Sequence, residues 1–160
     1  MNEFYTIQNY AIGAAALLSF TRSYYSTTDR KEGPTIPLTL PVLPLIFNEN
    51  CIAAITQVKS ITKPRFLTIL SENRDIPVGL QGRMIDMYPQ TLRSLNLGFS
   101  TNILQYNKAS GEIIPSNKRQ AIPDFLFAEN QQIIRASRII GKWFALYPIN
   151  ELCLSLNISF

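Results

Sequence analysis

Four closely spaced prolines constrain the fold of this chain more than any other feature. They are Pro34, Pro37, Pro41 and Pro44, and the residues between them are mostly leucine, isoleucine and valine. Proline fixes φ and lacks the backbone N–H, so this spacing excludes a helix and permits only extended or edge-strand backbone over residues 34–47. A Pro-x-x-Pro ligand of a recognition domain is the alternative, but such ligands lie in exposed tails. The apolar content therefore predicts a buried extended segment.

Apolar residues at helical spacing dominate the rest of the chain. Steps of three and four residues place them on one face, which is typical of a helix packed on a core. The first helix is apolar on most sides, so we expect neighbours to cover two of its faces. Helices are expected at residues 4–27, 48–58, 64–72, 78–95, 129–147 and 148–154. Pro89 must kink or split the 78–95 helix, whose apolar positions are Leu80, Met84, Met87, Tyr88, Thr91, Leu92 and Leu95.

The periodicity changes after residue 98, where a short β-hairpin is predicted. Residues 103–106 and 112–114 favour strands, and Lys108-Ala109-Ser110-Gly111 between them favours a turn. We therefore expect an α+β fold, with one mostly helical domain over residues 1–160 and a small hairpin. The hairpin follows the 78–95 helix, so a winged helix is one arrangement that fits, with Lys108 near a nucleic-acid backbone.

The chain contains no histidine, which removes several catalytic mechanisms. Without imidazole there is no Ser-His-Asp or Cys-His nucleophile pair and no His-ligated zinc. Cys51 and Cys153 lie 102 positions apart in apolar stretches, so they fit buried hydrophobes rather than a metal or redox pair. Gly141-Lys142 is followed by Trp143 rather than Ser or Thr, so Gly141 is expected to pack and not to cradle phosphate. We expect no metal, no cofactor and no enzymatic activity.

Composition also bears on where the chain works. The apolar run at residues 10–20 is eleven residues long, whereas a membrane span needs about 20. A buried helix is therefore expected there, with no membrane association. Two lone cysteines fit a reducing, cytoplasmic compartment. Charged residues make up 16% of the chain, below the usual share of about a quarter, which indicates a protein that sits against other chains.

Two groups of residues are candidates for binding. Arg135, Arg138 and Lys142 recur at steps of three and four opposite the apolar face of the 129–147 helix. Such a basic stripe is either a solvated helix face or a contact for phosphates or an acidic partner. The second group is the glycine-flanked segment 78–84, at the start of a methionine-bearing helix. Methionines there fill a core or provide an adaptable partner surface.

Several segments together resemble one family, the middle component of bacterial three-component ABC systems, which include the Lamassu-type anti-phage systems. The resemblance is carried, in order along the chain, by residues 10–17 (YAIGAAAL), 40–47 (LPVLPLIF), 79–84 (GLQGRM), 91–96 (TLRSLN), 141–145 (GKWFA) and 156–160 (LNISF). None of these segments is a catalytic signature, so the set and its order carry the resemblance.

The resemblance implies a non-enzymatic adaptor subunit. Such a subunit bridges an SMC- or RecN-like ATPase and an effector, often a nuclease, and restrains the effector until foreign DNA is sensed; duplex DNA would be met through the complex. The residues expected to contact partners are Gly79, Leu80, Gln81, Arg83 and Met84, with Trp143, Phe144 and Phe160 as core or docking anchors. The alternative is a winged-helix DNA-binding regulator, in which the 78–95 helix and the hairpin would contact DNA.

Overall fold

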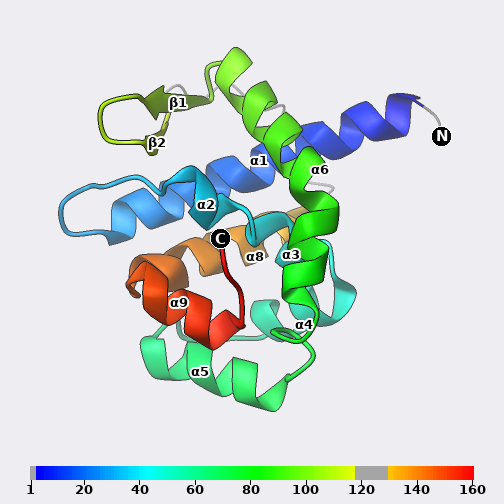
Figure 1. Cartoon of the computed structure of the whole chain (residues 1–160), viewed down its shortest axis with the longest axis vertical. Helices are drawn as coiled ribbons and strands as arrows, with labels where there is room; N and C mark the ends of the chain where they lie inside the picture. The colour runs from blue at the N-terminus through cyan, green and yellow to red at the C-terminus, as the bar shows by residue number, and fades with distance from the viewer. Residues whose placement is uncertain (1–2, 118–129) are drawn as a thin grey trace.

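The computed structural model describes residues 3–117 and 130–160. In these ranges the chain is mostly helical with one two-stranded antiparallel hairpin, which confirms the predicted α+β class (Figure 1). The elements are α1 (Glu3–Thr27), α2 (Ile36–Thr39), α3 (Val42–Ile46), α4 (Glu49–Thr56), α5 (Lys63–Glu72), α6 (Leu80–Ser100), β1 (Leu104–Asn107), β2 (Glu112–Pro115), α8 (Gln131–Ala145) and α9 (Ile149–Leu156).

The core forms where α1 and α8 pack along each other. Leu17 and Phe20 of α1 are fully buried. The ring of Phe20 meets that of Phe144 on α8 edge to face, with centroids 5.6 Å apart and planes at 86°. Helix α6 packs against another side of α1. The prediction that the first helix is covered on two faces is therefore confirmed.

The proline-rich segment forms two short helices, so the prediction of extended backbone is wrong from residue 36 to residue 46, whereas Thr35 is extended and pairs with Glu112 in an antiparallel bridge. Pro37 lies in the first turn of α2, and Pro41 is the N-cap of α3. Pro44 is the third residue of α3. At each position proline is tolerated, because the N–H groups at a helix start have no partner within the helix. The predicted burial is confirmed, since every residue of α3 is buried.

Helix α6 starts two residues later and ends five residues later than the predicted 78–95 helix. Pro89 lies inside α6 without splitting it, and α6 continues through Gly98 to Ser100 instead of ending at residue 95. A side chain at position 98 would crowd the start of the hairpin, because a Cβ atom there would lie 2.8 Å from Leu104 Cδ1 and the Leu104 side chain would have to shift. The predicted hairpin is confirmed, with Leu104 opposite Pro115 and Asn107 opposite Glu112.

The C-terminal third follows the predicted order of two helices and an apolar end. Helix α8 begins at Gln131 and α9 ends at Leu156. From there the last residues turn back from α9 across the molecule (Figure 1). Two basic residues of the connector after the hairpin, Lys118 and Arg119, and the first residue of the predicted 129–147 helix lie outside the described residues.

None of the described helices is by itself long and apolar enough to cross a membrane. Residues 36–46 and α4 together reach that length and composition, but they bend by 99° at the break between them. Apolar side chains from both parts, including Leu43 and Ile55, are buried in the core.

Candidate protein-binding site

Three of the residues predicted to contact a partner meet in one shallow groove. Gln81 and Met84 on α6 lie beside Phe160 at the end of the chain, although about half the sequence separates them. The groove encloses about 230 Å³, and its remaining lining residues are Leu40, Ile85, Tyr88 and Ser159. Its walls are mostly apolar, which makes it a candidate contact surface rather than a reaction centre.

Gly79 and Leu80, also predicted as contacts, set the start of α6. Gly79 is the N-cap, with φ of 77°, in the left-handed region that favours glycine. Leu80 follows as the first helical residue and is fully buried. The structure therefore places Leu80 in the core and Gly79 at the turn that directs Gln81 and Met84 into the groove.

The C-terminal segment forms the second wall of the groove. Asn157 ends α9 with φ of 54°, and this left-handed residue reverses the chain. The side chain of Ile158 is buried, and the backbone N–H of Ser159 donates a hydrogen bond of 2.8 Å to Gln81 Oε1. Phe160 stays 52% exposed beside this contact. Gln81 thus joins the two walls.

Arg83 turns away from solvent toward the loop that precedes α6. Its Nη2 donates to the carbonyl of Ile76 at 3.2 Å and lies 3.8 Å from Cys51 Sγ, and its Nη1 donates to the carbonyl of Val78 at 3.5 Å. Burial raises the pKa of the Cys51 thiol, and the positive charge of Arg83 partly offsets this rise. The contacts indicate that Arg83 positions the loop and the helix start.

The apolar positions of α6 divide into a buried face and an exposed stripe. Met84 and Leu95 are buried, but Tyr88 and Leu92 are 49% and 37% exposed. Ile85, which the sequence did not single out, is 67% exposed. The signal that could have found it is a second set of apolar steps, of three and four residues from Ile85 to Tyr88 and Leu92.

Trp143 and Phe144, predicted as core or docking anchors, both lie in the core. Trp143 is fully buried, its ring lies 5.0 Å from that of Phe66, and its Nε1–H donates to the carbonyl of Thr62 at 3.1 Å. Phe144 packs on Phe20, as described above. Neither side chain lines the groove.

The predicted basic stripe is exposed on α8. Arg135, Arg138 and Lys142 all face solvent, and α8 contains no acidic residue. Among the described residues, none of the three side chains forms an ion pair or hydrogen bond. The opposite face of α8 is fixed against α1, where Ser23 Oγ donates to the carbonyl of Arg138 at 2.6 Å. The stripe is therefore a separate cationic surface on a rigid helix, distinct from the groove.

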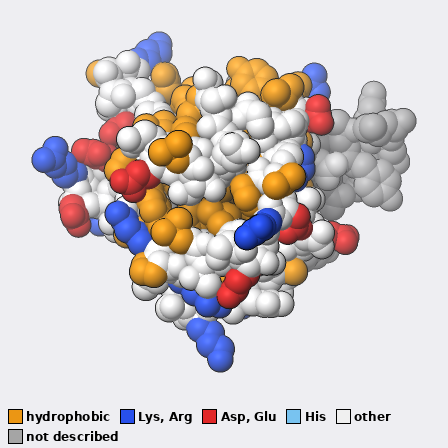
Figure 2. Space-filling model, turned by 60° about the horizontal axis from the view of Figure 1, so that its bottom comes forward, with side chains coloured by type: hydrophobic (Ala, Val, Ile, Leu, Met, Phe, Trp, Pro, Cys, Tyr) orange, Lys and Arg blue, Asp and Glu red, His pale blue; other side chains and the backbone are white. Residues whose placement is uncertain are grey.

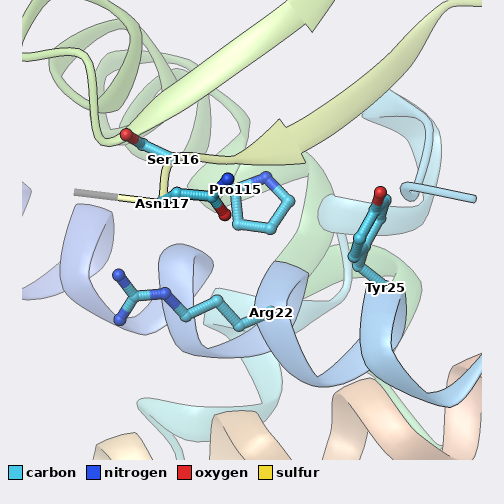
Figure 3. A pocket seen from close by; sticks show the side chains of 5 residues that line it. All are labelled: Arg22, Tyr25, Pro115, Ser116 and Asn117. Atoms are coloured by element: carbon cyan, nitrogen blue, oxygen red, sulfur yellow. The ribbon is translucent and has the colours of Figure 1, made fainter. Parts of the chain in front are cut away.

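A second hollow of about 410 Å³ lies between α1 and the end of β2 (Figure 3). Arg22 and Tyr25 extend from α1 at its two sides, with Pro115, Ser116 and Asn117 above them. Burial lowers the pKa of Arg22. The hollow contains none of the predicted site residues.

Within residues 3–117 and 130–160, no three cysteine or acidic side chains gather as metal ligands, and the expectation of no metal stays a prediction.

Further apolar side chains are exposed on α5 and α9. Leu67 and Ile149 are about half exposed, and Leu154 is almost fully exposed. Figure 2 shows the molecule from the side on which these helices lie, with hydrophobic side chains near the centre of the face and charged ones mostly toward its margins. These residues lie on two helices, whereas the groove brings apolar side chains of α6 and the C-terminal segment together around one hollow.

Comparison with known proteins gives one match. The sequence model of the family described as ABC-three component (ABC-3C) system Middle Component 3 matches residues 1–160. No curated protein matches the chain, and no solved structure matches it.

Proposed function

The chain belongs to the ABC-three component (ABC-3C) system Middle Component 3 family, and on that premise we propose that it is a non-enzymatic adaptor. It joins an SMC- or RecN-like ABC ATPase to an effector, expected to be a nuclease, in a Lamassu-type anti-phage complex of the bacterial cytoplasm. In this role it restrains the effector until foreign DNA is sensed, and it needs no cofactor of its own.

The observation that carries the proposal is the groove between α6 and the C-terminal segment. It brings together large exposed apolar side chains, notably Ile85, Tyr88 and Phe160, from two segments that are distant in the sequence. Contiguous apolar surface of this kind is typical of a site that another protein covers. The absence of histidine and the low share of charged residues support contact rather than chemistry as the work of this chain.

Co-purification tests the adaptor role directly. The tagged chain, expressed together with the proteins encoded beside it, is expected to bring down an ATPase and an effector in one complex. Recovery of the chain alone, together with tight duplex-DNA binding and a steep salt dependence, would overturn the adaptor role in favour of the winged-helix regulator.

Simple charge arithmetic favours weak DNA binding by the isolated chain. The slope of log affinity against log salt is about −0.9 for each neutralised phosphate, so the three cations of the α8 stripe give roughly −2.7. In the regulator, α6 would be the helix that contacts DNA. Both arginines of α6 already have partners within the chain, because Arg83 binds the carbonyl of Ile76 in the loop before α6 and Arg93 Nη1 donates to Tyr10 Oη at 2.6 Å. A slope much steeper than this would support the regulator.

A matched pair of tyrosine variants locates the contact. Tyr88→Ala, which truncates a 49% exposed ring in the groove, is expected to weaken recovery of a partner about tenfold or more, as truncation of an interface aromatic does. Tyr106→Ala on β1 truncates a ring of similar exposure, 45%, outside the groove, and is expected to leave recovery unchanged. Equal losses for the two variants would remove the groove from the interface.

A further inference from the structure

One edge of α6 presents an apolar stripe along the groove. Ile85, Tyr88 and Leu92 are 67%, 49% and 37% exposed, and steps of three and four residues separate them. At 1.5 Å of rise per residue the stripe is roughly 10 Å long, about two turns of helix. Ile85 and Tyr88 line the groove together with Met84 and Phe160, and Leu92 continues the stripe outside its lining.

The dimensions of the groove fit side chains of a protein segment. Pockets that hold small molecules enclose about 300–1,000 Å³, whereas this groove encloses about 230 Å³ and is open along its length. A stable dimer buries about 800 Å² and some 20–30 residues on each partner. The stripe and the end of the chain offer only four large exposed side chains here, so a second copy of this chain is too large an occupant for the surface available.

The walls of the groove favour a helix over an extended peptide. Extended peptides bind by adding main-chain hydrogen bonds to a strand edge. On one side the wall is α6, which presents only side chains, and on the other the N–H of Ser159 is already bonded to Gln81. Steps of three and four residues are the spacing with which two packed helices present side chains to each other.

The outer rim of the stripe carries two opposite charges. Asp86 and Arg93 follow Ile85 and Leu92 in the sequence and are seven residues apart, so both lie along the same edge of α6. Arg93 is held in place by Tyr10, whose ring lies 5.6 Å below the guanidinium and whose hydroxyl accepts its hydrogen bond. Asp86 has no ion-pair partner among the described residues.

We propose that the groove binds an amphipathic helix of a partner subunit. The helix presents apolar residues at steps of three and four, with a basic residue opposite Asp86 and an acidic residue opposite Arg93, two turns apart. This inference rests on the adaptor role and specifies the kind of segment that docks and its charge pattern.

Photocrosslinking in the co-purified complex tests the occupant. The full chain carries p-benzoylphenylalanine in place of Tyr88, and the crosslinked peptide is identified by mass spectrometry. A partner peptide with the apolar spacing and the two flanking charges is the expected result. A crosslink to a second copy of the chain, or to a partner peptide without that pattern, overturns the inference and leaves the adaptor role intact.

Charge reversal on the rim provides an independent readout. Asp86→Lys is expected to weaken association about fivefold to tenfold, and reversal of the basic residue in the crosslinked peptide is expected to restore it. Asp29→Lys, the same charge change at an exposed loop position, serves as the control and is expected to have no effect. Equal effects of Asp86→Lys and Asp29→Lys overturn the inference, whereas a failure of any partner to co-purify overturns the adaptor role itself.

Discussion

Gly141 lies where α8 crosses α1, and a side chain there would collide with backbone. A Cβ atom at this position would come within 2.5 Å of the carbonyl oxygen of Phe20 and 2.9 Å of Ser23 Cβ. Because backbone cannot swing aside, Gly141→Ala is expected to lower the free energy of unfolding by about 1–3 kcal/mol. Denaturant unfolding followed by circular dichroism measures the change.

Gly82 provides the matched control on another helix. A Cβ atom at position 82 would meet nothing within 4 Å, and the residue lies within α6. Glycine inside a helix is less favourable than alanine by about 0.5–1 kcal/mol, so Gly82→Ala is expected to stabilise the protein by that amount. If both variants shifted stability in the same direction, the close approach of α1 and α8 would not be what requires glycine at position 141.

The packing role of Gly141 could be predicted from sequence, but the role of Arg83 could not. Gly141 precedes Lys and Trp in a helix with an apolar face, so its local neighbours exclude a phosphate loop. Arg83 beside two glycines indicated an exposed contact residue. Its guanidinium instead binds carbonyls of residues 76 and 78, which only the reversal of the chain before α6 brings within reach.

At the scale of elements, the prolines show how local rules mislead when helices are short. The interpretation of residues 34–47 assumed that a helix requires an N–H at every position. Helices of four and five residues consist mostly of their first turn, in which the N–H groups need no helical partner. The burial of this segment could be predicted from its apolar composition alone. Its conformation depended on the length of the helices, which the sequence pattern does not show.

The attachment of the C-terminal segment to α6 depends on Gln81. Gln81→Ala removes the oxygen that accepts the hydrogen bond from the Ser159 N–H. The amide of residue 159 is then expected to exchange with deuterium roughly fivefold faster, because one hydrogen bond contributes about 1 kcal/mol. Hydrogen–deuterium exchange of the C-terminal peptide measures this, and the free energy of unfolding is expected to change little.

The conservative variant separates the hydrogen bond from the bulk of the side chain. Gln81→Glu keeps an acceptor oxygen at the same distance along the side chain and is expected to preserve slow exchange at residue 159. Unchanged exchange in Gln81→Ala would show that burial of Ile158 alone holds the segment.

At the scale of the whole molecule, the sequence identified the parts of the candidate site but not their assembly. Gln81 and Met84 belong to one sequence motif and Phe160 to another, and the fold brings them together because Asn157 reverses the chain after α9. Ile85 was missed, since apolar positions on α6 were assigned to a single face. Helices α1 and α3 pack against α6, and this packing decides which of the two apolar stripes of α6 is buried. Both helices are distant from α6 in the sequence, so the local pattern of α6 does not contain this information.

The absence of histidine makes a prediction about stability against pH for the whole chain. Histidine is the side chain that ordinarily titrates between about pH 5 and pH 8, so stability is expected to be level from about pH 6 to pH 8.

Burial raises the pKa of Cys51 above its ordinary 9.0, and burial together with Glu32 and Glu112 raises that of Tyr24 above 10.0. In the unfolded chain both groups lose protons from their ordinary pKa values upward, whereas the folded protein still holds them. Ionisation then favours the unfolded state, so the free energy of unfolding is expected to fall as the pH rises above about 9.

Urea unfolding at a series of pH values measures both regions of this profile. Cys51→Ala removes one of these two acids, so its free energy of unfolding is expected to fall less steeply above about pH 9. The starting value is expected to be lower, because a buried side chain is shortened. Ile55→Ala, which shortens another buried side chain of α4 without removing an ionisable group, serves as the control and is expected to keep the wild-type slope. A slope in the wild-type protein between about pH 6 and pH 8 would contradict the level region expected without histidine. An unchanged slope above about pH 9 in Cys51→Ala would contradict the assignment of part of the alkaline loss to Cys51.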